Sequence, residues 1–126
     1  APYVTNGEPP DDILAAVVIP ADTSKPEALH NRGMPTSFDR EIRFTTQASQ
    51  AKVYTFFRRQ MLGRDWKIFS TGAPVGSDGV QILAQRGGSD SWFWIQGATI
   101  SPTRFLADGS QETTVTLRLY QASAGA

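Results

Sequence analysis

The segment from Thr46 to Ser70 constrains the fold most, because its apolar residues change from a helical to an extended spacing along it. At about 100° per residue, Val53, Phe57 and Met61 fall on one line of a helix. Tyr54 and Phe56 flank that line, so the apolar stripe is wide enough to cover a sheet. The spacing predicts one main helix over about residues 47–62.

The ends of this helix are marked by residues that favour helix boundaries. Thr46 or Ser49 is placed to accept a hydrogen bond from an unpaired N–H at the start. Gly63 follows the last apolar residue, where a left-handed backbone often ends a helix. Beyond it, Trp66 and Ile68 alternate with Lys67 and Phe69, which predicts that a strand begins there.

Other segments show the alternation that is typical of strands. Residues 38–46, 80–86, 91–101 and 113–120 are predicted strands, and Asp108-Gly109 is a predicted turn. A short helix is expected after Pro10, and residues 21–37 are expected to form a long loop. The predicted fold is α+β, with a mainly antiparallel sheet of four to six strands and the main helix on one face. Its core is expected to centre on Phe44, Phe57 and Trp66.

The 126 residues are enough for one domain. We expect a lead-in over residues 1–10, an α+β domain over 11–121 and a tail over 122–126. No apolar run reaches the ~18 residues that a membrane span requires, so no transmembrane segment is expected.

The charges balance over the whole chain but are distributed unevenly. Twelve basic residues match twelve acidic ones, so no overall field favours nucleic acid as a partner. Residues 40–67 contain seven basic and two acidic groups, whereas residues 1–39 contain two basic and six acidic groups. One interpretation is that the acidic N-terminal part lies near the basic helix.

The absence of cysteine excludes disulfides and thiol catalysis. The chain begins with Ala1, which suggests that a signal peptide, a membrane anchor or another segment preceded it. These features favour an extracytoplasmic location, either secreted or attached to a membrane through a removed N-terminal segment.

The predicted hairpin over residues 80–100 provides the leading candidate surface. A two- or four-residue connection would pair Leu83 with Trp94 and Gln85 with Trp92. The two tryptophans would then share one face of the sheet with glutamines, a combination that suits a sugar ring, a peptide or a partner protein. A three- or five-residue connection would exchange the faces. The candidate ligand-binding residues are Trp92, Trp94, Gln81, Gln85 and Gln96; a second, basic surface comprises Lys52, Arg58 and Arg59.

Enzyme chemistry has little support in the sequence. There is no nucleophile elbow, no phosphate-binding loop and no zinc motif, and His30 is the single histidine. Most aspartates outside the N-terminal part adjoin glycine or serine, as turn residues do. We therefore expect no catalytic residues, no metal site and no cofactor. A carboxylate pair assembled by the fold remains an alternative.

One pattern resembles a known group of proteins. The pattern comprises Val53, Phe56-Phe57-Arg58-Arg59, Leu62-Gly63 and Trp66, and it follows a strand that ends at Thr46. It resembles the pattern in small, uncharacterised extracytoplasmic α+β domains of actinobacterial lipoproteins and membrane-anchored proteins. The resemblance covers residues 13–120. Here Arg64-Asp65 separate the glycine and tryptophan, which are adjacent in that pattern. The resemblance implies a location in the cell envelope and a non-enzymatic module.

Three functions remain open at this point. The first is a non-enzymatic binding or interaction domain of the cell envelope, whose partner is a protein, a peptide or a glycan. The second is a small ligand-sequestering or hydrolase-like domain, with a pocket between the 21–37 loop and the sheet. The third is a structural domain that forms a homodimer through the sheet.

Overall fold

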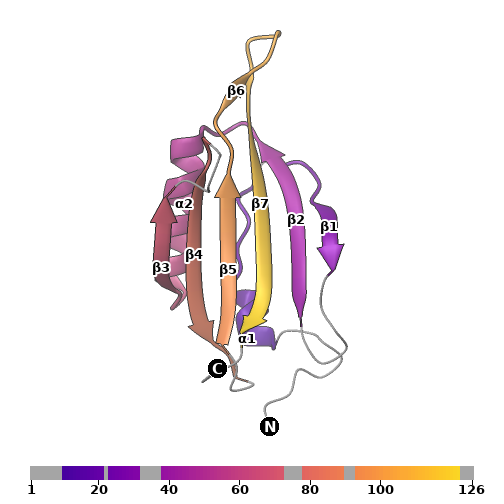
Figure 1. The fold of residues 1–126 in the computed structure, drawn as a ribbon. Coiled ribbons are helices and arrows are strands. Elements are labelled where there is room, and N and C mark those ends of the chain that lie inside the picture. The colour runs from indigo at the N-terminus through magenta and orange to yellow at the C-terminus, as the bar shows by residue number, and fades with distance from the viewer. Residues whose placement is uncertain (1–9, 22, 32–37, 73–77, 90–92, 123–126) are drawn as a thin grey trace.

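The computed structural model describes residues 10–21, 23–31, 38–72, 78–89 and 93–122. Within them, the sheet has the strand order β1-β2-β7-β5-β4-β3, and every neighbouring pair is antiparallel (Figure 1). The strands are β1 (Glu27–Asn31), β2 (Asp39–Thr46), β3 (Lys67–Gly72), β4 (Val80–Gly87), β5 (Phe93–Ile100), β6 (Arg104–Phe105) and β7 (Gln111–Ala122). The predicted α+β class with a mainly antiparallel sheet is confirmed.

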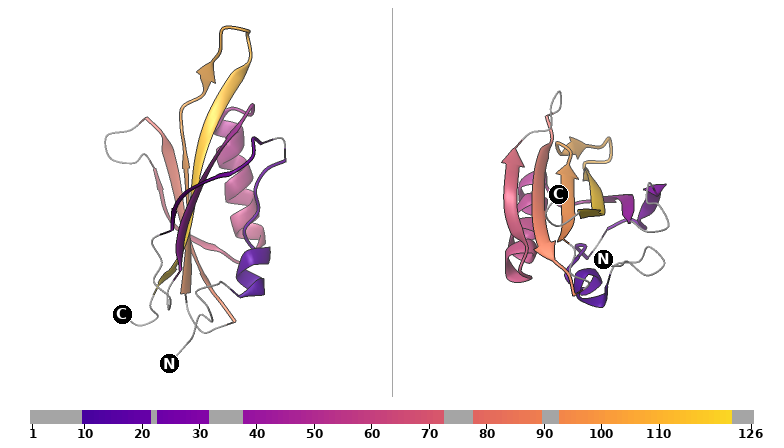
Figure 2. Two further views of the ribbon diagram at one scale, coloured as in Figure 1. Left: turned by 90° about the vertical axis from the view of Figure 1, so that its right-hand side faces the viewer. Right: turned by 60° about the horizontal axis from the view of Figure 1, so that its bottom comes forward.

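Strand β7 lies inside the sheet, where it pairs with β2 on one side and with β5 on the other. The N-terminal part of β7 extends beyond the sheet and pairs with the short β6, so that a hairpin projects from one end (Figures 1 and 2). Asp108 and Gly109 form its turn: Asp108 accepts hydrogen bonds from Ser110, and Gly109 has a φ of +87°. The predicted turn is therefore confirmed.

The main helix α2 (Gln50–Gly63) packs over β3, β4 and β5. Its start is capped by Ser49, whose Oγ accepts a hydrogen bond from the Lys52 N–H at 3.3 Å. The residues of the predicted stripe, Val53, Phe57 and Met61, are buried. The helix begins three residues later than expected, because residues 47 and 48 form bends before the cap.

The helix does not end as the sequence predicted. Gly63 is the last helical residue and lacks a left-handed backbone; Asp65 takes that conformation instead, with a φ of +67°. The N–H of Trp66 then reaches back to the carbonyl of Met61 at 2.9 Å, which closes the last turn. Arg64-Asp65 therefore form the reversal between helix and strand.

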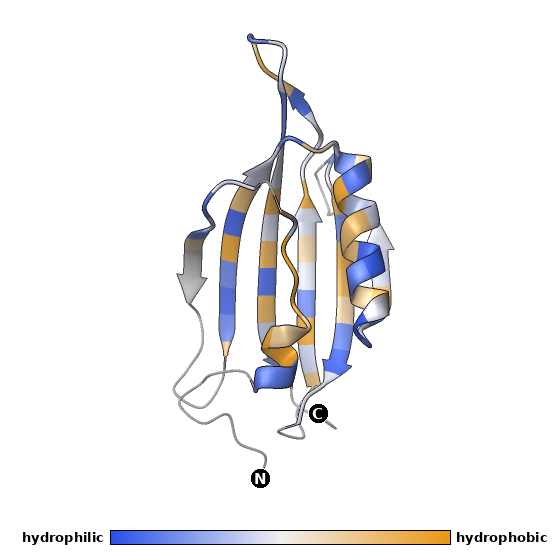
Figure 3. Cartoon of the chain, turned by 180° about the vertical axis from the view of Figure 1, so that it is seen from behind, coloured by the Kyte–Doolittle hydropathy of each residue, from blue (hydrophilic) through white to orange (hydrophobic). Residues whose placement is uncertain are grey.

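A short helix, α1 (Asp11–Ala15), and the extended segment after it cover the same face of the sheet as α2 (Figure 3). Ile13 and Ala16 are buried, and Val17 and Ile19 pack against the core. The other face, which Figure 1 shows, carries no helix of the described chain. The main cluster of buried apolar side chains lies between the sheet and this single helical layer.

The predicted centre of the core is confirmed: Phe44, Phe57 and Trp66 are 1 %, 0 % and 2 % exposed. The prediction of a loop over residues 21–37 was partly wrong. Residues 27–31 form the edge strand β1, and Thr23 bridges to Thr46. Proline, glycine and serine flank this short strand, and residues of these types are typical of a loop, although its pairing partner β2 is the next strand along the chain. Residues 32–37 lie outside the described residues.

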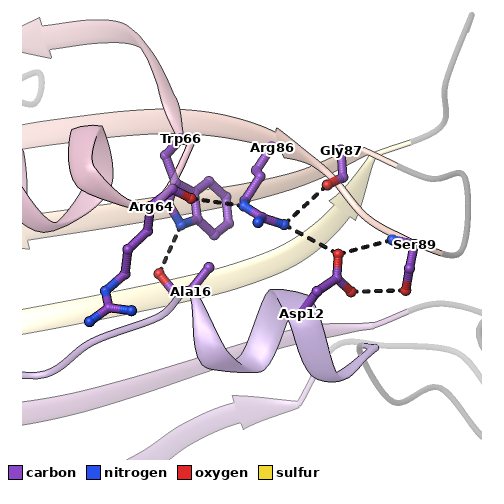
Figure 4. A network of polar contacts seen from close by, with 7 residues as sticks. All are labelled: Asp12, Ala16, Arg64, Trp66, Arg86, Gly87 and Ser89. Atoms are coloured by element: carbon purple, nitrogen blue, oxygen red, sulfur yellow. Dashed lines mark hydrogen bonds and ion pairs between the residues drawn. The ribbon is translucent and has the colours of Figure 1, made fainter.

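A polar network holds α1 against the sheet (Figure 4). The Asp12 carboxylate accepts hydrogen bonds from Ser89 N at 3.1 Å, Ser89 Oγ at 2.9 Å and Arg86 Nη1 at 3.3 Å. The Trp66 indole N–H donates to the carbonyl of Ala16 at 2.9 Å. These contacts join both ends of α1 to residues at least 50 positions away in the sequence. The short helix is therefore fixed by the tertiary structure.

Candidate functional site

The predicted tryptophan-glutamine surface does not form. In the structure Leu83 pairs with Gly97, Arg86 with Trp94, and Gly87 with Phe93. The connection between β4 and β5 therefore has five residues, 88–92, and this odd length places Trp94 on the helix side of the sheet. The Trp94 side chain is 0 % exposed, and its ring meets that of Phe38 edge-on at 5.7 Å between centroids. The predicted register was wrong.

The other members of that surface are separated by the same change of register. Gln96 is 2 % exposed and lies on the helix side, whereas Gln81 and Gln85 are half-buried on the opposite side. Trp92 lies outside the described residues. In the same register, Ile100 pairs with Val115 and is buried on the face that carries Trp94.

Part of the predicted basic surface forms, because α2 presents Lys52 and Arg59 on one exposed side. The two residues are seven apart, which places them nearly in line along the helix. Phe56 lies between them and the core, half-buried, with its ring perpendicular to that of Phe57 at 5.5 Å between centroids. Arg58 is exposed as well, but helical geometry places it on the other side of α2.

Two adjoining hollows lie along this side of the helix. One, of about 490 Å³, is lined by residues of α2 alone, including Lys52, Phe56 and Arg59. The other, of about 590 Å³, shares Lys52 and Phe56 and lies between α2 and the segment after α1. We call the two together the helix groove; its lining residues are Pro20, Ala21, Thr46, Gln47, Ala48, Ala51, Lys52, Val53, Thr55, Phe56, Arg59 and Gln60.

The helix groove combines an apolar base with positive charge. Phe56, Val53 and Ala48 supply apolar surface, and no aspartate or glutamate is among the lining residues in the part of the chain that the structure describes. Lys52 and Arg59 form no ion pair with any described residue. The groove therefore suits an anionic group attached to an apolar one.

Three acidic residues of the N-terminal part bind arginines of the sheet. Asp12 binds Arg86 at 3.3 Å, and Glu27 binds Arg43 at 3.3 Å. Asp39 holds Arg118 through two hydrogen bonds, of 2.9 and 2.7 Å. The N-terminal part passes beside α2 at Pro20 and Ala21, and the expectation that its acidic residues lie near the basic helix stays a prediction.

The start of α2 adds no anion site of its own to the groove. Two of its first three N–H groups are already bonded: Gln50 N donates to Thr103 Oγ1 at 2.8 Å, and Lys52 N donates to Ser49 Oγ. An anion in the groove would consequently be held mainly by side-chain charges.

A hollow also exists where the sequence predicted a pocket beside the 21–37 segment. It has about 290 Å³ and lies between Thr23-Ser24, the end of β2 and the projecting hairpin. Among the described residues, Glu112 is its only acidic lining residue, and that carboxylate pairs with Arg104 at 2.8 Å. The described part of the hollow thus offers hydroxyl and amide groups, and no pair of carboxylates for acid-base chemistry.

Among the described residues, no group of three or more His, Cys, Asp or Glu side chains is arranged to hold a metal ion. No described helix has both the length and the apolar character needed to cross a membrane. Searches of protein-family models, of curated proteins and of solved structures return no match. The function of the site therefore has to follow from the charges, contacts and hollows of its described residues.

Sequence reasoning identified the cations of the helix groove but missed its second wall. That wall consists of Pro20 and Ala21, which meet α2 only because α1 and the following segment cross the sheet beside the helix (Figure 3). The signal in the sequence is the apolar run Val17-Val18-Ile19 before Pro20. This run indicates an extended segment but does not reveal which element that segment lies against.

Proposed function

We propose that this chain is a non-enzymatic binding domain of the cell envelope, and that its helix groove binds an acidic, partly apolar segment of a partner protein. The observation that carries the proposal is the presence of two cations, Lys52 and Arg59, on either side of Phe56; neither forms an ion pair with a described residue, and no described lining residue is acidic. An extended or helical peptide that alternates carboxylates with leucine or phenylalanine matches this arrangement.

The arrangement of the groove lowers the cost of binding. Phe56 is held by the edge-on contact with Phe57, and the helix that carries both cations is capped and packed on the sheet. Little backbone ordering is then needed when a partner binds, and the ordering cost falls mainly on the exposed side chains of Lys52 and Arg59. Exposed ion pairs contribute only about 0.2–1 kcal/mol each, so we expect weak, salt-sensitive binding in which Phe56 contributes apolar contact.

The proposal is tested with a short fluorescent peptide in which glutamate alternates with leucine, titrated with the protein and followed by fluorescence anisotropy. A peptide with lysine in place of glutamate is the charge control. We expect the acidic peptide to bind and the basic one not to. Raising the salt concentration should weaken binding, since the Debye length falls from about 10 Å at 0.1 M to about 3 Å at 1 M.

Adjacent arginines provide a matched pair of variants. Arg59 lines the groove, whereas Arg58 is equally part of α2 and exposed but lines neither hollow. Arg59→Glu should weaken the acidic peptide about tenfold, and Arg58→Glu, with the same change of net charge, less than about threefold. Equal losses would indicate attraction by net charge alone and would contradict a site in the groove.

The location is a separate part of the proposal. It is supported by the resemblance to extracytoplasmic domains. Protease added to intact cells of the source organism should digest the protein without prior lysis. Protection in intact cells with digestion after lysis would contradict the location and leave the groove proposal to its own test.

A further inference from the structure

The sheet face opposite α2 carries a hollow above Gly97, near the middle of β5. It has a volume of about 230 Å³. We call it the sheet hollow; its lining residues are Glu41, Gln81, Leu83, Gly97, Thr99, Thr116, Arg118 and Tyr120. They come from four neighbouring strands, β2, β7, β5 and β4, so the position of each is fixed by strand pairing.

Gly97 provides the floor of the sheet hollow. It pairs directly with Leu83 on β4 and with Arg118 on β7, whose side chains stand on either side of it. A Cβ at this position would lie 3.0 Å from Leu83 Cδ2, closer than ordinary van der Waals contact. A glycine in a strand interior costs stability, and here it leaves open the space that a side chain would fill.

The polar wall of the sheet hollow is rich in groups that both donate and accept hydrogen bonds. Thr99 and Thr116 pair with each other across β5 and β7, and Gln81 pairs with Thr99 from β4. Two hydroxyls and one amide thus follow one row of the sheet on one side of Gly97. A ligand with several adjacent hydroxyl groups could exchange hydrogen bonds with all three.

The charged wall holds one basic and one acidic side chain of the described residues. They are Arg118 and Glu41, which are neighbours in the register of β7 and β2. The Arg118 guanidinium is fixed by its two hydrogen bonds to Asp39 and lies 4.1 Å from the centre of the Tyr120 ring. Those hydrogen bonds, with smaller effects of the Asp39, Tyr120 and Glu41 charges, raise the pKa of Arg118 although burial opposes this. Its unused N–H groups remain donors of fixed direction.

We propose that the sheet hollow binds one ring of a neutral saccharide. Its volume is below the ~300 Å³ at which pockets for drug-sized ligands begin, so it suits a single ring. Hydroxyl, amide and guanidinium groups meet the ring hydroxyls, and Leu83 with the Tyr120 ring offers apolar surface to its C–H groups. Because Asp39 already binds Arg118 and Glu41 also lines the hollow, no excess of positive charge is left to favour an acidic sugar over a neutral one. The proposal concerns the opposite face from the helix groove and does not depend on it.

The test uses the ¹⁵N-labelled protein, titrated separately with glucose, galactose, mannose and N-acetylglucosamine and followed by the shifts of its amide signals. Glucuronic acid and glucosamine serve as the charged counterparts. We expect at least one neutral sugar to bind at millimolar concentration and to shift the amides of Gly97, Thr99, Thr116 and Arg118. The charged counterpart of that sugar should bind more weakly.

Two threonines on the same strand and face give a matched pair. Thr116 lines the sheet hollow, whereas Thr114 lies two residues away and is not among the lining residues. Thr116→Val should weaken the sugar roughly fivefold through the loss of one hydrogen bond, and Thr114→Val should leave binding unchanged. Lys52→Glu, in the helix groove, should also leave it unchanged.

Three results would overturn the proposal. The first is the absence of shifts with all four neutral sugars up to their solubility. The second is an equal effect of Thr116→Val and Thr114→Val, and the third is tighter binding of a charged sugar than of its neutral counterpart. Because the acidic peptide is measured separately, failure here does not affect the helix groove.

Discussion

At the scale of single residues, Asp12 shows how one carboxylate organises the end of the molecule. Its two oxygens accept hydrogen bonds from Ser89 and Arg86, and Arg86 in turn donates through Nε to the carbonyl of Arg64 at 2.9 Å. Burial alone would raise the pKa of Asp12, but the hydrogen bonds of Ser89 and Arg86 outweigh it and hold the pKa below its ordinary value. The ionised form is therefore the one that binds α1 to the sheet.

A depressed pKa makes this stabilisation depend on pH. Above an unfolded aspartate's pKa of about 3.9, the contribution of Asp12 is fully present; it is lost as the pH falls through the lower pKa of the folded state. D12N should lower the free energy of unfolding at about pH 6, and its difference from the wild type should shrink between about pH 4 and pH 2. Urea titrations of both proteins across this range measure the effect.

The control for this prediction is Asp11→Asn on the same short helix, which removes one charge beside Asp12. Asp11 is exposed and has none of the bonds to Ser89 and Arg86. If the two variants lose the same stability with the same pH dependence, the effect belongs to the charge of the helix start and not to the network.

Residue-scale predictions from the sequence succeeded where they rested on periodicity. Helical spacing identified Phe57, and alternation identified Phe44, both of which are almost wholly buried. The position of Trp94 was predicted wrongly because alternation along one strand does not state which residues it faces on the next strand. That register depends on the length of the connection between β4 and β5, which places Trp94 opposite Arg86 on the covered side.

At the scale of elements, the end of α2 is the clearest local departure from sequence reasoning. A glycine beyond an apolar stripe predicts a left-handed residue, yet here Asp65 takes that conformation and Gly63 stays helical. The pairing of Trp66 with α1 explains the difference. Its indole must reach the carbonyl of Ala16, and the two residues after Gly63 provide the turn that brings it there.

Two substitutions at this helix end should have effects opposite to a simple glycine-cap expectation. Gly63→Ala should stabilise the protein by about 0.5 kcal/mol, because alanine loses less conformational entropy in a helix. An added Cβ meets nothing within 4 Å there. Asp65→Gly should also stabilise by about 0.5 kcal/mol, because glycine adopts a positive φ without strain. Thermal and urea unfolding measure both changes.

Asp65→Ala is the control, since alanine tolerates the left-handed conformation less well than aspartate; it should destabilise the protein by about 0.5–1 kcal/mol. A destabilising Gly63→Ala would place the left-handed residue at Gly63 and contradict the observed helix end.

The connections between elements limited the prediction of both the fold and the site. Strands and the main helix follow from local patterns, so β2, β4, β5 and β7 were identified with small differences at their ends. The edge strand β1 was missed because its partner β2 follows only after several residues rich in turn signals. The register of β4 and β5 depended on a connection whose length the sequence left open, and the helix groove depended on a segment crossing the sheet.

At the scale of the whole molecule, one helical layer on one sheet face makes a single core that reaches from α1 to β7. Trp66 and Trp94 lie at different places in this core: the first bonds to the segment after α1, and the second is on the central strand β5. Both are almost wholly buried, at 2 % and 0 %. A disturbance of either the helical layer or the sheet should therefore reach both indoles.

A Trp92→Phe protein, which retains only these two indoles, should unfold in one step. We expect its tryptophan fluorescence and its far-ultraviolet circular dichroism to give the same urea midpoint, as a small domain with one core does. Acrylamide should quench the fluorescence weakly before that midpoint and strongly after it. Light scattering of the native protein, run alongside, shows whether the protection belongs to a monomer or to a dimer formed through the open sheet face. Fluorescence that changes before the circular dichroism would show that the helical layer leaves the sheet first, and would contradict a single cooperative core.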